Sequence, residues 1–325
     1  MSLQQGEDRF PQAAAGRRFP QPQAIPSGVR SAPLPALAAM HRRAGSVARR
    51  ATLPALLCIA AACQRGDATV ALRAPGDNEI PAGALGASIR RGRALLEHTP
   101  DSLPANVGNK LRCLSCHLDG GMRVNSAPLV GVYARFPQYS ARSGTTITIQ
   151  DRINGCFVRS MNGHPLPAAS PALRDITAYL AFLSRDVPVG AHVKGEGFAA
   201  MTPLKGDSAV GRMLFASRCA RCHGDDGGGT AVAPPVWGAQ SFNIGAGMAR
   251  LRTAASFIRH NMPYDQPGTL TDQQAFDVAA YVTSRPRPDL PGKEYDWPRG
   301  GAPPDVAYPT LGTPPHEAAR AQAKN

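Results

Sequence analysis

The chain has 325 residues, including 31 Pro and 33 Gly, and only 6% of its residues are aromatic. This length allows two domains of ordinary size, but so few aromatic side chains are a thin supply for two apolar cores. A large buried prosthetic group would supply the missing core. The net charge is +13, yet the basic residues form no basic helix with interleaved aromatics, which argues against nucleic acid as a partner.

The N-terminal part carries much of this charge, because +6 of the +13 falls within residues 1–62. Residues 1–39 lack a hydrophobic period and are predicted to be disordered, or to be an upstream extension from a misassigned start. Residues 40–63 combine a basic start with a short apolar run, which predicts an export signal and a periplasmic protein. The apolar run is too short to span a bilayer. Cys63 follows small residues, so a lipid anchor at Cys63 stays open, although Ala60 stands where leucine is usual.

The chain has seven cysteines, which are Cys58, Cys63, Cys113, Cys116, Cys156, Cys219 and Cys222. Four of them form Cys113-Leu-Ser-Cys116-His117 and Cys219-Ala-Arg-Cys222-His223. A lone C-x-x-C is typical of a zinc site or a redox pair, whereas two C-x-x-C-H motifs in one exported chain are typical of covalent c-type haem. The sequence therefore predicts two covalently bound c-type haems, with thioethers from the four cysteines and with His117 and His223 as iron ligands.

The predicted elements follow the same order twice. After a linker at residues 64–80, a first helix is expected from Gly86 to about His98, ahead of the first haem motif. A second helix starts where Ser170 is the N-cap and Pro171 the first helical residue. A third helix begins near Asp207 and runs into the second haem motif.

A last helix starts at a capping box made by Thr271 and Gln274. The two cycles also match in detail, since Gly92-Arg93 precedes the first haem motif and Gly211-Arg212 the second. This repeat of about a hundred residues resembles two tandem class I cytochrome c domains. It implies an all-α fold with long loops, a first domain at 81–195, a second at 196–300 and a solvated tail at 301–325. The resemblance also implies that a proline carbonyl holds each haem histidine, namely Pro128 in the first cycle and Pro234 or Pro235 in the second.

The sixth iron ligand decides what such a haem does. Met262 lies 39 residues after His223, just before the last helix, and Cys156 lies 39 residues after His117. Met248 competes with Met262, although it reads better as a loop packing residue, and His260 should point elsewhere. Cys156 is interpreted as an iron ligand rather than a buried free thiol, because an odd cysteine is unusual in an exported protein. A thiolate there lowers the haem potential and can bond transiently to a substrate sulfur.

Arginines gather near Cys156 in the sequence. Arg142, Arg152 and Arg159 lie within eighteen residues of one another, and Ser160 follows directly. A guanidinium binds two oxyanion oxygens at once, so this pattern predicts an anion pocket.

The stretch Asp151-Arg-Ile-Asn-Gly-Cys-Phe-Val-Arg-Ser-Met-Asn-Gly163 resembles the signature of the dihaem thiosulfate dehydrogenases, which join two thiosulfates into tetrathionate. Residues 241–248, 257–263 and 288–297 resemble the family as well, so the resemblance covers roughly 80–300. It implies an active-site haem with His/Cys ligands and a second, electron-relay haem whose sixth ligand is Lys or Met. Arg259 cannot supply a neutral amine, which favours Met262. By position, Arg142, Arg152 and Ser160 match the substrate-pocket residues of the family.

The function predicted is therefore oxidation of thiosulfate to tetrathionate at Cys156, with electrons passing to an external acceptor such as a small cytochrome c or a high-potential iron–sulfur protein. Three alternatives stay open. The chain could be a dihaem electron carrier without a substrate of its own, a sulfur-carrier cytochrome, or the same enzyme working as a tetrathionate reductase.

Overall fold

The computed structural model describes residues 69–312. The predictions for residues 1–39 and for the export signal at 40–63, including lipidation of Cys63, lie outside the described residues. Within residues 69–312, no helix has both the length and the apolar character needed to cross a membrane.

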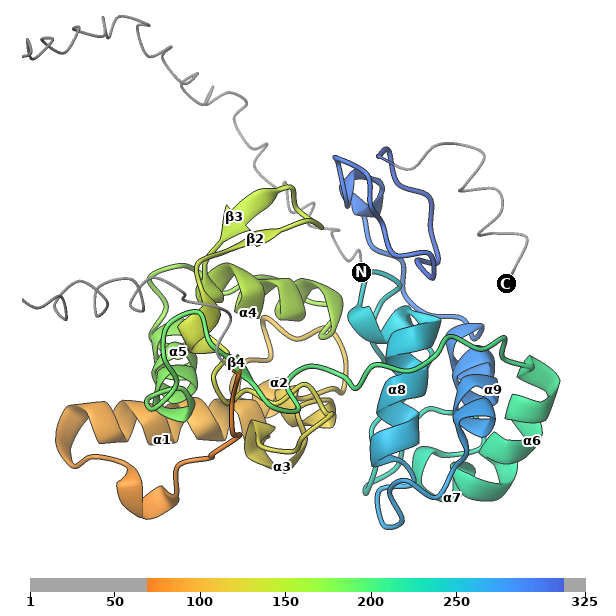
Figure 1. The fold of residues 1–325 in the computed structure, drawn as a ribbon, viewed down its shortest axis with the longest axis horizontal. Coiled ribbons are helices and arrows are strands. Elements are labelled where there is room, and N and C mark those ends of the chain that lie inside the picture. The colour runs from red at the N-terminus through yellow and green to blue at the C-terminus, as the bar shows by residue number, and fades with distance from the viewer. Residues whose placement is uncertain (1–68, 313–325) are drawn as a thin grey trace, which may run out of the picture. The chain divides into compact units, whose positions relative to one another are not determined.

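The described chain is helical with little sheet, which confirms the all-α class (Figure 1). In chain order the helices are α1 (Gly83–Glu97), α2 (Thr99–Ser102), α3 (Leu118–Gly121), α4 (Ile149–Arg159), α5 (Pro171–Leu183), α6 (Ser208–Arg218), α7 (Ala220–His223), α8 (Leu251–Asn261) and α9 (Asp272–Thr283). The strands are β1 (Thr69–Val70), β2 (Gln138–Ser140), β3 (Thr145–Ile147) and β4 (His192–Val193). β1 pairs parallel with β4, and β2 pairs antiparallel with β3 in a hairpin that opposes Tyr139 to Thr146.

The first cycle is built on the packing of α1 against α5 (Figure 1). Gly92 lies at the crossing, where a Cβ atom would stand 2.0 Å from the carbonyl oxygen of Asp175. The second cycle repeats this arrangement with α6 against α9, and a Cβ at Gly211 would stand 1.9 Å from the carbonyl oxygen of Asp277. Both glycines are therefore required by backbone contact. The internal repeat read from Gly92-Arg93 and Gly211-Arg212 is confirmed as a repeated helix crossing.

Three of the predicted helix starts are confirmed by their caps. The Ser170 hydroxyl accepts from the Leu173 amide at 3.1 Å, and the Asp207 carboxylate accepts from the first amides of α6. Thr271 forms the predicted capping box with Gln274. α1 begins at Gly83, slightly before the predicted start, and ends at Glu97.

Each cycle has its own buried apolar cluster. The first cluster joins α1, α4 and α5 through residues such as Leu96, Phe157 and Leu180. The second cluster joins α6, α8 and α9 through Phe215, Ala255 and Phe276. Both clusters surround the haem motif of their own cycle, since Cys113 packs against the first and Cys219 against the second.

The chain after α9 differs from the prediction of a solvated tail from residue 301. Val306 and Tyr308 are buried and pack with Trp297 in a small third cluster. The segment of residues 288–312 lies beside the β2–β3 hairpin, with the Trp297 amide donating to the Arg142 carbonyl at 2.7 Å (Figure 1). The apolar residues of this segment gain burial by covering the first half of the chain.

Candidate functional site

Helix α4 places the signature residues of the first cycle. Thr148 caps its start, because its hydroxyl accepts from the Asp151 amide at 3.2 Å while the Asp151 carboxylate accepts from the Thr148 amide at 2.8 Å. These two hydrogen bonds hold the pKa of Asp151 below its usual value. The capping box fixes where the helix begins. Arg152 and Cys156 then follow one turn apart on the same face, with Ser160 as the C-cap residue.

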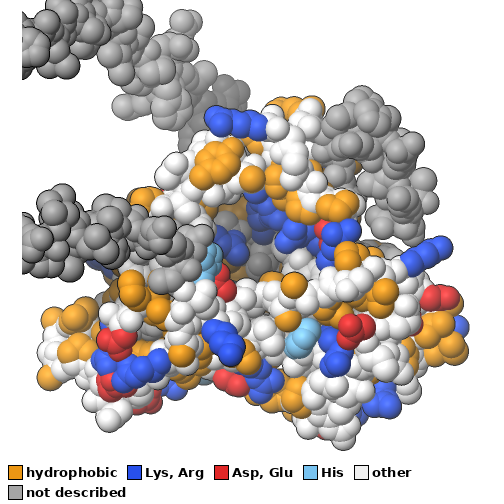
Figure 2. Space-filling model, in the orientation of Figure 1, with side chains coloured by type: hydrophobic (Ala, Val, Ile, Leu, Met, Phe, Trp, Pro, Cys, Tyr) orange, Lys and Arg blue, Asp and Glu red, His pale blue; other side chains and the backbone are white. Residues whose placement is uncertain are grey.

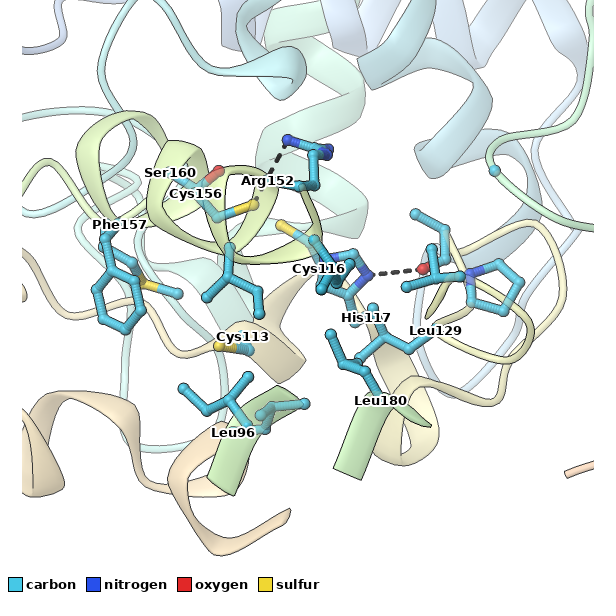
Figure 3. Close-up of a pocket in the computed structure, with 18 of the residues that line it drawn as sticks. Leu96, Cys113, Cys116, His117, Leu129, Arg152, Cys156, Phe157, Ser160 and Leu180 are labelled. Atoms are coloured by element: carbon cyan, nitrogen blue, oxygen red, sulfur yellow. Dashed lines mark hydrogen bonds between the residues drawn. The ribbon is translucent and has the colours of Figure 1, made fainter. Parts of the chain in front are cut away.

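Cys156 faces the first haem motif across a cavity (Figure 3). Cys113, Cys116 and His117 line one part of the cavity, and Cys156 lies opposite them on α4. The remaining walls are mainly apolar, and they include Leu96, Leu111, Leu129, Ile149, Ile153, Phe157, Ile176 and Leu180. The structure thus brings the predicted cysteine and the predicted haem motif to one site.

Two further predicted residues reach this cavity. Arg152 places a terminal nitrogen 3.6 Å from the sulfur of Cys156 (Figure 3), and Ser160 lies at the cavity wall. A guanidinium beside a cysteine sulfur favours the thiolate, which is the form that ligates iron and attacks sulfur.

His117 is held in the form that a metal ligand needs. Its Nδ1 donates to the carbonyl oxygen of Ala127 at 2.6 Å, which leaves the other ring nitrogen free to ligate. Burial lowers the pKa of His117, so the ring is neutral. The prediction that Pro128 supplies this carbonyl is wrong by one residue. Ala127 has a φ of 46° and its amide donates to Gly197 at 2.8 Å, and this turn presents the Ala127 carbonyl to the ring.

The second haem motif repeats this arrangement. Nδ1 of His223 donates to the carbonyl oxygen of Pro234 at 2.8 Å, so Pro234 is the acceptor of the two proline candidates. Burial also lowers the pKa of His223. The loop that follows is tied back to the motif, because the Thr230 hydroxyl donates to the Cys222 carbonyl at 2.6 Å.

The candidate sixth ligands of the second cycle separate in the structure. Met262 packs against the second cluster together with Cys219, whereas Met248 packs against the first cluster. His260 donates from Nδ1 to the Ser256 carbonyl of its own helix at 2.9 Å. Met262 is therefore the candidate that shares a core with the second haem motif.

The other predicted arginines lie in a different place from Arg152. Arg142 is in the turn between β2 and β3, where it donates to the Gly245 carbonyl at 2.7 Å. Burial and the neighbouring charge of Arg159 lower the pKa of Arg142 to about 10, so it remains a cation at neutral pH. Arg159 is engaged in a two-bond ion pair with Asp296, at 2.6 and 2.8 Å. Figure 2 shows Lys and Arg side chains around a hollow on this face of the molecule.

The first cavity suits a haem in both shape and polarity. Its walls are apolar, with the two motif cysteines and a neutral histidine at one end. Arg135 also lines it, and the Nε of Arg135 is buried with no hydrogen-bond partner among the described residues. A haem carries carboxylates that such a nitrogen can bind. Nothing in the local sequence pattern distinguished Arg135, since it lies in a loop without a motif.

Comparison with known proteins assigns the two halves. Residues 105–189 match the family model described as SoxA/TsdA, cytochrome c domain. Residues 206–282 match the model described as Cytochrome C oxidase, cbb3-type, subunit III. The chain also matches the thiosulfate dehydrogenase of Allochromatium vinosum, at 50% identity over 68% of this chain and 86% of the relative.

The chain belongs to the thiosulfate dehydrogenase family. A second member, the thiosulfate dehydrogenase of Psychrobacter arcticus, is 45% identical over 72% of this chain and 74% of the relative. Among solved structures, the thiosulfate dehydrogenase (TsdBA) of Marichromatium purpuratum aligns with a TM-score of 0.65 at 35% identity. That alignment covers 68% of this chain and 51% of the other. As in other dihaem cytochromes of the thiosulfate dehydrogenase family, this fold of two tandem cytochrome c domains carries two covalently bound c-type haems.

Proposed function

We propose that this chain is a thiosulfate dehydrogenase that oxidises two thiosulfates to one tetrathionate and two electrons, at a haem ligated by His117 and Cys156. The observation that carries the proposal is the position of Cys156, opposite Cys113, Cys116 and His117 across one cavity. The matching spacing of Met262 after His223 supports a second haem with different ligands. Bound haems supply two one-electron acceptors.

The cysteine can divide the reaction into two sulfur-transfer steps. In the first, the thiolate of Cys156 and the outer sulfur of one thiosulfate form an S–S bond, and two electrons are released. In the second, the outer sulfur of another thiosulfate attacks the substrate sulfur of this bond. Tetrathionate then leaves and the Cys156 thiolate is restored, so atoms and charge balance.

The arginines address the repulsion between the substrates. Two unit charges 4 Å apart repel by about 1 kcal/mol in water, so two dianions repel by about four times as much, and more in a drier site. Arg152, beside the Cys156 sulfur, can hold one sulfonate end. We propose that Ser160 and Arg142 complete the pocket, with Arg142 serving the more distant sulfonate.

The haem attachments follow from the same proposal. Thioethers from Cys113 and Cys116 hold the first haem, and thioethers from Cys219 and Cys222 hold the second. His223 and Met262 ligate the second iron, from which electrons pass to an external acceptor such as a small cytochrome c or a high-potential iron–sulfur protein. The packing of Met262 and Cys219 in one cluster supports this assignment.

We also propose that the protein is periplasmic. The support is the basic and then apolar sequence of residues 40–63. Mass spectrometry of the N-terminus of the exported protein tests the export signal, and an acyl group on Cys63 would add a lipid anchor. An intact Met1 in the haem-loaded protein would contradict the signal.

The decisive experiment uses the purified holoprotein with thiosulfate and ferricyanide. Tetrathionate should form at half the thiosulfate consumed, and Cys156→Ser should keep both haems attached while losing turnover. A dihaem electron carrier would instead show chemical haem reduction but no thiosulfate-dependent electron flow. Full activity in Cys156→Ser would contradict the proposed chemistry even if thiosulfate is oxidised.

A further inference from the structure

The segment of residues 288–312 lies beyond both matched cytochrome c domains, which end at residues 189 and 282. It nevertheless folds against the chain. The Ile244 amide donates to the Pro288 carbonyl at 2.9 Å, and the Leu311 amide donates to the Glu294 carbonyl at 2.8 Å. Its core is the cluster of Trp297, Val306 and Tyr308. These contacts give the segment a defined structure that neither haem domain requires.

Trp297 touches Arg142 in two ways. Its amide donates to the Arg142 carbonyl at 2.7 Å, and its ring centre lies 4.7 Å from the guanidinium carbon of Arg142. The other side of the arginine is tied by the hydrogen bond from Arg142 to the Gly245 carbonyl. The guanidinium is therefore held between an aromatic face and a backbone carbonyl, so that little freedom remains for its last side-chain torsions.

The backbone of Trp297 supports a built contact. Its φ is 53°, a value that residues other than glycine adopt only where the surrounding structure holds them there. The Gly300 amide donates to the Trp297 carbonyl at 2.9 Å and closes the turn. Trp297 is also 5% exposed, so its ring is sequestered from water together with the arginine that it faces.

The same segment controls the charge around Arg142. Asp296 is buried and accepts from both terminal nitrogens of Arg159, and the Tyr308 hydroxyl donates to it at 2.7 Å. Burial raises the pKa of Tyr308 to about 12, so the hydroxyl keeps its proton. Arg250 also acts on Arg142 as a neighbouring positive charge. Three guanidiniums thus share one carboxylate, and that carboxylate is committed to Arg159, which leaves positive charge at Arg142 for an anion.

We propose that Trp297 is a positioning residue for Arg142, and that the 288–312 segment completes the anion pocket of the first haem domain. This inference rests on the proposed thiosulfate dehydrogenase function. The ring fixes the direction of the guanidinium, and the Asp296–Arg159 pair keeps Arg142 available to the sulfonate of a thiosulfate or tetrathionate. Trp297 itself touches neither the substrate nor a haem in this scheme.

The test compares Trp297→Leu, Trp297→Phe and the control Val306→Ala in the holoprotein. Trp297→Leu should raise the KM for thiosulfate about tenfold, which corresponds to the loss of one desolvated cation–π contact. The kcat and the absorption spectra of both haems should stay within experimental error of the wild type. Trp297→Phe keeps a ring and should fall between. Val306→Ala trims the same cluster without touching Arg142 and should leave KM unchanged.

A double-mutant cycle separates positioning from a general structural role. In the Arg142→Ala background, Trp297→Leu should have no further effect on KM, because the ring acts through the arginine. An equal effect in both backgrounds, or an equal KM change in Val306→Ala, would overturn the inference. Wild-type activity with a KM that Trp297→Leu leaves unchanged would sink this inference alone. Absence of thiosulfate oxidation by the wild type would remove the proposed function and the inference together.

Discussion

Arg152 and Cys156 lie one helical turn apart on α4, with an arginine nitrogen 3.6 Å from the cysteine sulfur. The helix therefore supplies a sulfur and a neighbouring cation from one rigid element, which is a more accurate support than a loop. The same contact explains why the sequence of this helix is read as a unit, since a shift of one residue would move both groups off the cavity wall.

Removal of the Arg152 charge should weaken substrate binding. Arg152→Ala is expected to raise the KM for thiosulfate about 10- to 100-fold, because a hydrogen bond to a charged group contributes about 1.5–3 kcal/mol. Steady-state kinetics with ferricyanide measures this effect. Arg174→Ala on α5 is the control, since its guanidinium donates to the Ala169 carbonyl instead. Unchanged KM in Arg152→Ala would exclude Arg152 from the substrate pocket.

Substitution of Met262 should affect the second haem only. Met262→Leu is expected to remove the thioether–iron charge-transfer absorption of the oxidised protein and to lower the reduction potential of one haem, because the axial ligand sets the potential. Met248→Leu should change neither. Absorption and potentiometric titration of both variants measure the outcome, and loss of the same absorption in Met248→Leu would transfer the ligand role to Met248.

The two helix crossings should not tolerate a side chain. Gly92→Ala and Gly211→Ala place a Cβ about on top of a carbonyl oxygen, 2.0 and 1.9 Å away. Each should lower the free energy of unfolding by about 1–3 kcal/mol or more, as overpacking does. Gly155→Ala on α4 is the matched control, because its Cβ meets nothing within 4 Å. Urea unfolding compares the three variants, and equal stability of all of them would contradict the crossing geometry.

Asp175 should make stability depend on acid pH. Hydrogen bonds from Arg91 hold the pKa of Asp175 below its usual value in the folded state. A carboxyl with a depressed folded pKa contributes stability above its unfolded pKa and loses it as pH falls through the folded one. Asp175→Asn should therefore be less stable than the wild type at pH 7, with a smaller difference near pH 3.

Urea unfolding at the two pH values measures that difference. Asp101→Asn changes an exposed carboxyl of α2 and should give nearly the same stability as the wild type at both. A difference between Asp175→Asn and the wild type that grows toward low pH would reverse the sign of the argument.

The sequence predicted those features that depend on local spacing. Caps at Ser170 and Thr271 were readable because a side-chain oxygen and its amide partner are three residues apart. The repeat was readable because both glycines precede their motifs by similar distances. Local spacing also carried the juxtaposition of Cys156 with the first haem motif, although only the fold shows the cavity between them.

Features that depend on distant contacts were not readable. Ala127 holds His117 in place of Pro128 because its backbone is fixed by Gly197, 70 residues later in the chain. The burial of Tyr308 depends on Asp296 and on the cluster with Trp297, for which the Pro- and Ala-rich sequence after residue 300 gives no periodic signal. Arginines 142 and 159 were predicted as one pocket, yet a carboxylate from the C-terminal part divides their roles.

The contact between Arg142 and Trp297 joins residues that are 155 positions apart in the chain. During synthesis and export, the first domain can fold and receive its haem long before residue 297 emerges. The last part of the polypeptide then docks onto a half that is already built, and loop closure over this length comes late. A chain that ends early would keep its colour and its electrons but lack a finished grip on its substrate.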